Sequence, residues 1–268
     1  MELFVLQFLL VITGLGFVFF NIVEPIYVFF YNKPLVVHSH LLPRRISDEQ
    51  RNILAQNFPF YNKLSPSKKR YFEHRINKFI DKHEFIGHEI EITDEILVLI
   101  SGTYVMLTFG MRNYLSDLFQ KILIYPTVYY STINEVYHKG EFNPRMKTVV
   151  FSWEDFLSGH GVATDNINLG LHEFTHVMHF HCLKSRDVNA AIFQDEYAEI
   201  VAIYTSPELI QQINDKAYFR LYAYENQFEF ISVLLEHFFE SPNDFKTIHP
   251  QLYAHVKRMI NFNENYFT

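Results

Sequence analysis

The run His172-Glu173-Phe174-Thr175-His176 places two imidazoles and a carboxylate where they could act on one metal ion. Histidines four residues apart lie one turn apart on the same face of a helix, so both rings can reach a zinc ion at roughly 2.0 to 2.1 Å. Glu173 can take a proton from water on the metal and pass it to a leaving amine. The pattern predicts the ligands and the general base of a zinc hydrolase.

A third protein ligand must come from elsewhere, because catalytic zinc has three protein ligands and a water. Glu196, 20 residues after His176, and Glu229, 53 residues after it, are the candidates. Glu229 lies in the run from Tyr222 to Phe239, which is apolar nearly all round and is expected to form a buried helix. A carboxylate there is costly unless it is paired or binds a metal, which favours Glu229, although spacing alone leaves both open.

Glu236 lies two turns after Glu229 on the same expected helix and faces the same way. One of these carboxylates can bind the metal while the other accepts a hydrogen bond from a ligand histidine. His179 and His181 follow the His172 run, and we expect solvent exposure or outer contacts from them, not ligation.

Four segments in order along the chain resemble the Mlc titration factor A family of zinc peptidases, over roughly residues 70 to 260. They are Glu91–Glu95, Val149–Asp155, Leu171–His176 and Glu229–Phe239. The resemblance implies a gluzincin-type zinc site with three ligands, His172, His176 and Glu229. It implies Glu173 as the base and Tyr222 as a hydroxyl donor to the oxyanion. With Glu229 as the ligand, Glu236 is the expected acceptor for a ligand histidine.

Two features depart from that family. A proline-containing turn is usual between the tyrosine and the glutamate, whereas this chain has Glu225-Asn226-Gln227, so Tyr224 is an alternative to Tyr222. The family's soluble members also lack the apolar N-terminal segment of this chain, so their location is not carried over.

The resemblance is compatible with two functions. The first is a zinc-dependent peptidase that hydrolyses a peptide or protein substrate. The second is a regulatory binding protein that sequesters a transcription factor around a vestigial or structural zinc site, since the family is named for titrating a sugar-responsive repressor. The complete set of ligands, base and hydroxyl donor favours the peptidase.

Composition narrows the alternatives. A chain of 268 residues is long enough for a substantial core, and its formal charge of -7 argues against a nucleic-acid partner. Cys182 is the single cysteine, which excludes an intrachain disulfide and a cysteine-based zinc site. We expect it to be a packed thiol.

The first 31 residues differ from the rest and are predicted to be a membrane anchor. From Leu3 to Phe20 the only polar side chains are Gln7 and Thr13, so this segment could cross most of a roughly 30 Å hydrocarbon core. Pro25 is expected to break or kink the helix. Basic residues follow the segment and none precedes it, which predicts a single pass with the catalytic domain in the cytoplasm. A helix packed on the domain's own core is the alternative.

Residues 32–46 are predicted to be a linker and residues 47–268 the metallopeptidase domain. Capping residues at Ser47, Ser65 and Thr93 indicate helix starts, and the chain from Asn168 onward is mainly helical. The expected strands are Glu89–Ile92, Ile122–Tyr125, Val128–Tyr130 and Lys147–Trp153. The fold class is therefore α+β, a mainly helical zincin-like domain with a small sheet behind one transmembrane helix. The family resemblance implies that the stretch from Thr148 to Trp153 is an edge strand on which a peptide could lie, and a plain core tryptophan is the alternative for Trp153.

Overall fold

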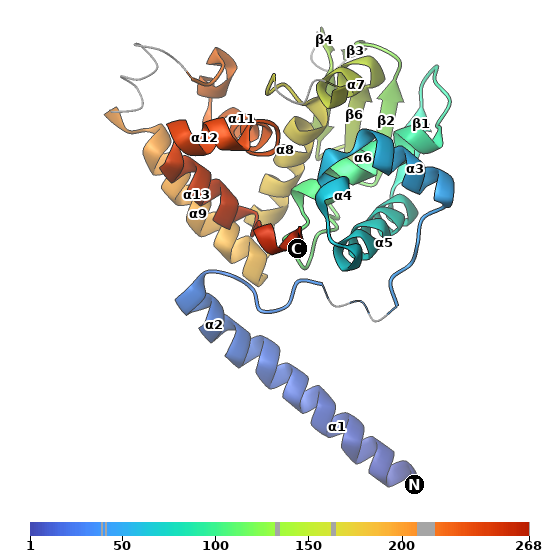
Figure 1. Cartoon of the computed structure of the whole chain (residues 1–268), viewed down its shortest axis with the longest axis vertical. Coiled ribbons are helices and arrows are strands. Elements are labelled where there is room, and N and C mark those ends of the chain that lie inside the picture. Colours follow the sequence, from blue (N-terminus) through green and yellow to red (C-terminus); the bar gives the residue numbers. More distant parts are fainter. Residues whose placement is uncertain (39, 41, 132–134, 162–164, 208–217, 268) are drawn as a thin grey trace.

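The computed structural model describes residues 1–38, 40, 42–131, 135–161, 165–207 and 218–267. It confirms a mainly helical α+β fold with a small sheet and one N-terminal apolar helix (Figure 1). The helices are α1 (Glu2–Val18), α2 (Glu24–Tyr31), α3 (Asp48–Asn57), α4 (Pro59–Lys63), α5 (Pro66–Lys82), α6 (Asp94–Leu107), α7 (Trp153–Gly161), α8 (Leu169–Lys184), α9 (Val188–Tyr204), α11 (Gln227–Glu240), α12 (Pro242–Ile248) and α13 (Pro250–Met259). The strands are β1 (Glu84–Gly87), β2 (Lys121–Tyr125), β3 (Tyr129–Ser131), β4 (Val136–His138), β5 (Gly140–Asn143) and β6 (Thr148–Ser152). Short 3₁₀ turns occur at Leu221–Tyr224 and Glu264–Tyr266.

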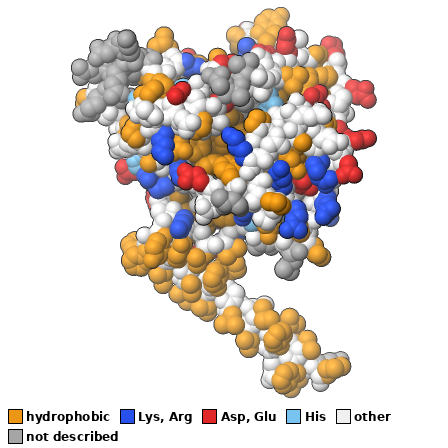
Figure 2. Space-filling model, viewed as in Figure 1, with side chains coloured by type: hydrophobic (Ala, Val, Ile, Leu, Met, Phe, Trp, Pro, Cys, Tyr) orange, Lys and Arg blue, Asp and Glu red, His pale blue; other side chains and the backbone are white. Residues whose placement is uncertain are grey.

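The N-terminal segment is one apolar helix that projects from the domain (Figures 1 and 2). Its 29 residues from Leu3 to Tyr31 form a helix that is long and apolar enough to cross a membrane. The expected break at Pro25 is absent. Pro25 lies in the first turn of α2, and the π-helical turn Phe19–Val23 just before it accommodates the proline without ending the helix.

Polar contacts tie the end of this helix to the domain. Glu24 is fully buried, where it pairs with the Arg112 guanidinium and accepts a hydrogen bond from the Leu35 N–H at 3.1 Å. Asn32 ends α2 in the left-handed region, at φ 49°, and its side-chain amide donates to Glu196 at 2.6 Å. The helix is therefore attached at a defined place on the domain.

The main sheet has the order β1-β2-β6-β5. β2 pairs in parallel with β1 and β6, and β5 runs antiparallel to β6. The prediction of an edge strand at residues 148–153 is therefore wrong. β6 lies between two strands and is fully buried, Trp153 begins α7, and the edge strand on this side is β5.

The predicted strand Glu89–Ile92 is also wrong, because the strand lies earlier, at β1. The chain turns sharply after β1: Glu89 has φ 62°, and a Cβ on Gly87 would lie only 1.9 Å from the Ile90 carbonyl oxygen. The apolar alternation at Ile90 and Ile92 reflects packing of an irregular segment on the core. The capping predictions are confirmed at Ser47, which forms a capping box, and at Thr93.

α8 is the central helix of the core. On one side it packs on α6 and the sheet, where the Phe174 ring lies 5.1 Å from Tyr104 and 5.3 Å from Phe151. On another side it packs on α11, whose residues from Phe230 to Phe238 are all buried. The two helices that carry the predicted metal ligands are thus fixed against each other by the core.

Candidate metal centre

The start of α8 is set by its cap. The side chain of Asn168, the residue before the helix, accepts a hydrogen bond from the Leu171 N–H at 2.9 Å. Because Leu171 and Phe174 point into the core, the opposite face of the helix presents His172 and His176 toward α11.

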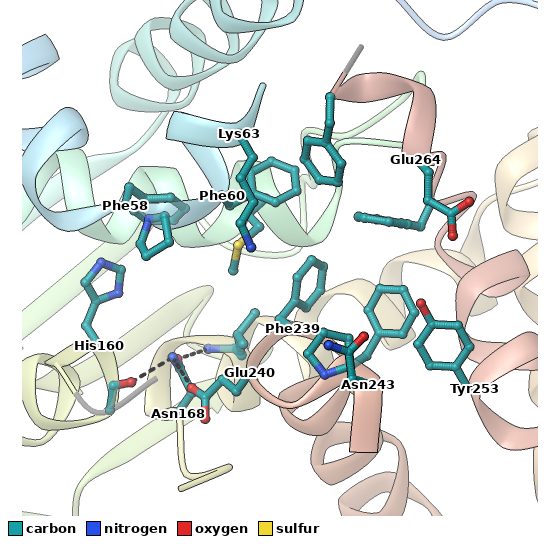
Figure 3. A pocket seen from close by; sticks show the side chains of 18 residues that line it. Phe58, Phe60, Lys63, His160, Asn168, Phe239, Glu240, Asn243, Tyr253 and Glu264 are labelled. Atoms are coloured by element: carbon teal, nitrogen blue, oxygen red, sulfur yellow. Dashed lines mark hydrogen bonds between the residues drawn. The ribbon is translucent and has the colours of Figure 1, made fainter. Parts of the chain in front are cut away.

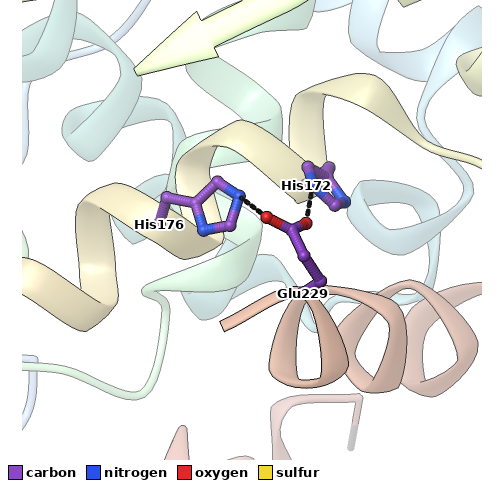
Figure 4. A group of neighbouring side chains, drawn as sticks. All are labelled: His172, His176 and Glu229. Atoms are coloured by element: carbon purple, nitrogen blue, oxygen red, sulfur yellow. Dashed lines mark ion pairs between the residues drawn. The ribbon is translucent and has the colours of Figure 1, made fainter. Parts of the chain in front are cut away.

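Three predicted ligands converge between α8 and α11 (Figure 4). The Nε2 atom of His172 lies 2.9 Å from Glu229 Oε2, and the Nε2 atom of His176 lies 3.7 Å from Glu229 Oε1. Within the described part of the chain, this is the one group of three or more potential ligand residues whose donor atoms lie close enough to share an ion.

The chemistry of these donors fits a metal ion. Glu229 Oε2 is buried and accepts no hydrogen bond with acceptable geometry, despite its proximity to the His172 ring. An unsatisfied buried carboxylate oxygen is costly unless a cation completes its surroundings. Two imidazole nitrogens and one carboxylate oxygen are the donor set of catalytic zinc.

The His172 ring is oriented from behind by Glu236. Its Nδ1 atom lies 2.9 Å from Glu236 Oε1, which leaves Nε2 for the metal position. Glu236 is fully buried, accepts two hydrogen bonds from the Arg220 guanidinium at 2.7 and 2.8 Å, and accepts one from the Asn168 N–H at 3.0 Å. Burial alone would raise the pKa of Glu236, but His172 and Arg220 outweigh burial and hold that pKa below its usual range.

The field at the site favours a cation. Burial lowers the pKa of His172, yet contacts with Glu229 and Glu236 outweigh burial and raise it to about 10. Burial, helped by the neighbouring His172, lowers the pKa of His176 to about 4, so this ring is neutral. The carboxylates that attract a proton to one ring would equally attract a divalent ion between both rings.

Glu173 lies on the same face, beside β5. Burial raises the pKa of its carboxyl to about 7, and the backbone N–H of Phe142 donates a hydrogen bond to it. Gly140 makes room for this side chain, because a Cβ there would lie 3.0 Å from Glu173 Cγ and 3.1 Å from its Oε1. A carboxyl that titrates near neutrality can both accept and return a proton.

Of the two candidate tyrosines, Tyr222 is the one at the site. Its ring centroid lies 5.6 Å from that of His172, and its hydroxyl donates to Glu229. Burial and this carboxylate raise the pKa of Tyr222 far above its usual range, so the hydroxyl stays protonated. Tyr224 instead packs near Phe230, with ring centroids 6.1 Å apart.

Glu196, the rival third ligand, belongs to a different cluster. Its oxygens accept hydrogen bonds from His255 Nδ1 at 2.7 Å and from Arg258 Nε at 2.7 Å, besides Asn32 of the N-terminal segment. These partners account for its burial without a metal.

The structure adds one residue that the sequence interpretation missed. This residue is Arg220, which pairs with Glu236. The sequence could have indicated it, because a carboxylate on a buried helix needs a cation nearby. His179 is buried, not exposed, with its ring 4.4 Å from that of Tyr197, and Cys182 is a packed thiol as expected.

Comparison with known proteins places this arrangement in context. A family model described as glucose-regulated metallo-peptidase M90 matches residues 37–260 of the chain. An uncharacterized protein of Synechocystis sp. is 25% identical over 238 residues, which cover 82% of this chain and 86% of that protein. The matched span includes α8, α11 and every residue described above at the metal centre.

Proposed function

The chain belongs to the glucose-regulated metallo-peptidase M90 family, and we propose that it is a zinc-dependent peptidase with ligands His172, His176 and Glu229. The observation that carries the proposal is the convergence of these three donors on one point, with His172 fixed by Glu236. When bound, zinc would supply a Lewis acid and an activated water.

The chain's own residues account for the remaining requirements of peptide hydrolysis. Glu173 would take the proton from the attacking water and deliver it to the leaving nitrogen, in keeping with its pKa of about 7. Tyr222, protonated and next to Glu229, would donate a hydrogen bond to the oxyanion that develops on the scissile carbonyl. The edge strand β5, whose Phe142 contacts Glu173, is the nearest backbone on which an extended peptide could pair.

The test compares wild-type protein with Glu173→Gln on a broad peptide library. We expect one zinc per chain in both proteins and loss of cleavage in the variant by about 10² to 10⁴, because the base is lost while the ligands stay. Full zinc occupancy with no cleavage by the wild-type protein, or unchanged cleavage by the variant, would refute the peptidase.

We also propose that the projecting helix anchors the domain in a membrane, with the domain on the cytoplasmic side. The helix is long and apolar enough, and Lys33, Arg44 and Arg45 follow it on the side of the domain, as expected of a cytoplasmic flank. Protease added to intact cells should leave the domain uncut but should digest it after lysis. Digestion in intact cells would show that the domain lies on the outer side of the membrane.

A further inference from the structure

A second site lies outside the metal centre, in a cavity of about 430 Å³ that none of the proposed catalytic residues lines. It is bounded by α4, the end of α7, the end of α11 and the C-terminal segment (Figure 3). Its volume is within the range of small-molecule sites, roughly 300 to 1,000 Å³.

The walls of this cavity are mainly aromatic. Seven phenylalanine and tyrosine rings contribute, and polar side chains such as Lys63, Asn243 and Glu264 lie among them (Figure 3). The rings are those of Phe58, Phe60, Phe238, Phe239, Tyr253, Phe262 and Phe267. Such walls suit a flat apolar or aromatic body and also attract a cation to their ring faces.

At one end of the cavity, two lining side chains each have a buried atom without a hydrogen-bond partner. Glu240 Oε2 and His160 Nε2 are both buried without a hydrogen-bond partner. Asn168, between them, has already used its amide group on the Gly159 carbonyl at 3.1 Å and on Glu240 Oε1 at 3.0 Å. The other ring nitrogen of His160 donates to the Asn57 carbonyl, so Nε2 is an acceptor.

We propose that this cavity binds a small molecule with an aromatic or apolar body and a protonated amine, which donates to Glu240 and His160. An ammonium group supplies several donors and a positive charge, which suits acceptors of this kind. The positive charge of the amine is also complementary to the negative charges of Glu236 and Asp165, which raise the pKa of Glu240. A hydroxyl would satisfy one acceptor and leave the charge unmatched.

The cavity and the metal centre share one residue. Asn168 holds Glu240 with its side chain and Glu236 with its backbone N–H, and Glu236 orients the His172 ring. A ligand seated on Glu240 would therefore lie two hydrogen bonds from a carboxylate of the metal centre.

The test uses three probes of similar shape: 2-phenylethylamine, 2-phenylethanol and 3-phenylpropionate. Each is titrated calorimetrically into the zinc-loaded full chain in detergent at about pH 7.5, where the amine is protonated. We expect the amine to bind at least about tenfold more tightly than the alcohol, as one charge-assisted hydrogen bond allows. If the cavity prefers a negative charge, 3-phenylpropionate would pair with Lys63 at the rim. Tighter binding of this acid than of the amine overturns the proposal.

Variants locate the binding. Glu240→Gln should weaken amine binding about tenfold or more, whereas Glu264→Gln, the same change at the exposed rim of the cavity, should leave it within about twofold. His160→Phe keeps the ring and removes the acceptor, and it should weaken the amine several-fold if Glu240→Gln does not fold. The proposal is overturned if the amine does not bind, or if its affinity is unchanged in Glu240→Gln. Binding of the amine at the metal would give this second result.

Discussion

Two buried carboxylates in this protein have nearly the same partners, yet only one adjoins the proposed metal site. Each accepts a hydrogen bond from the Nδ1 atom of a histidine, at 2.9 and 2.7 Å. Each is also bonded by an arginine: Glu236 accepts two hydrogen bonds from Arg220, at 2.7 and 2.8 Å, and Glu196 accepts one from Arg258, at 2.7 Å. The α11 cluster consists of Glu236, His172 and Arg220, and the α9 cluster of Glu196, His255 and Arg258.

The difference lies beyond the histidine. In the α11 cluster the free side of the ring faces Glu229, with His176 one turn away on the same helix. The α9 cluster belongs to no group of potential ligands in the part of the chain that is described, and Glu196 also bonds Asn32 of the N-terminal segment. A buried carboxylate, histidine and arginine thus serve structure in one place and orient a proposed metal ligand in the other.

The two clusters are best distinguished by changing Glu229, which faces the α11 cluster, and Glu196, which belongs to the α9 cluster. Glu229→Gln should lower zinc affinity by more than the 10- to 100-fold typical of outer contacts, because a direct ligand is lost, and cleavage should fall to background. Zinc content after dialysis against a graded chelator measures this.

Glu196→Gln is the matched control. It should keep one zinc per chain but lower the free energy of unfolding by about 1 to 3 kcal/mol, since the charge is lost and one of the two oxygens that accept from His255 and the partly exposed Arg258 becomes an amide donor. If zinc is lost from Glu196→Gln and retained by Glu229→Gln, the assignment of the two clusters is reversed.

A second prediction concerns the Tyr222 hydroxyl, which lies beside the α11 cluster. Tyr222→Phe should lower kcat by about 10² to 10³ with zinc content and KM little changed, because one oxyanion donor is removed. Tyr224→Phe, on the same 3₁₀ turn but packed near Phe230, should keep kcat within about threefold. Equal losses in both variants would show that the turn, not the Tyr222 hydroxyl, matters.

The sequence predicted the centre of this site better than its surroundings. The spacing of His172 and His176 and the apolar helix around Glu229 carry local information, since helix periodicity determines which residues share a face. Arg220 and the position of β5 depend on contacts between distant segments, which periodicity does not report. The failed strand at Glu89–Ile92 has the same origin: alternation shows which side chains are buried, not whether the backbone pairs.

A third prediction asks how much Glu236 contributes as an orienting residue. Glu236→Gln keeps the shape of the side chain but removes the charge that holds His172 and Arg220. Zinc affinity should fall about 10- to 100-fold, less than for Glu229→Gln. The same chelator series measures it, and an affinity equal to that of the wild-type protein would place Glu236 in a purely structural role, like Glu196.

The smallest expected effect comes from Glu240, a buried carboxyl one turn beyond Glu236 that has an asparagine but no arginine. Burial raises its pKa from 4.5 to about 7, so the folded protein holds a proton that the unfolded chain releases at lower pH. A raised carboxyl pKa means that stability falls as pH rises from about 4.5 to 7 and stays low above this range. Removing the titrating group abolishes this loss.

Glu240→Gln should therefore gain stability relative to the wild-type protein as pH rises, by about 1 to 2 kcal/mol between pH 4.5 and 7.5, once the shift is discounted for partial exposure. Urea unfolding at a series of pH values, at fixed zinc concentration, measures the difference. Glu264→Gln should show no such gain, because that carboxyl is exposed and its pKa is lowered by Lys257. If the difference in unfolding free energy between Glu240→Gln and the wild-type protein does not change with pH, Glu240 is stabilised by a cation as effectively as Glu236 is. The contrast between paired and unpaired buried carboxylates would then fail.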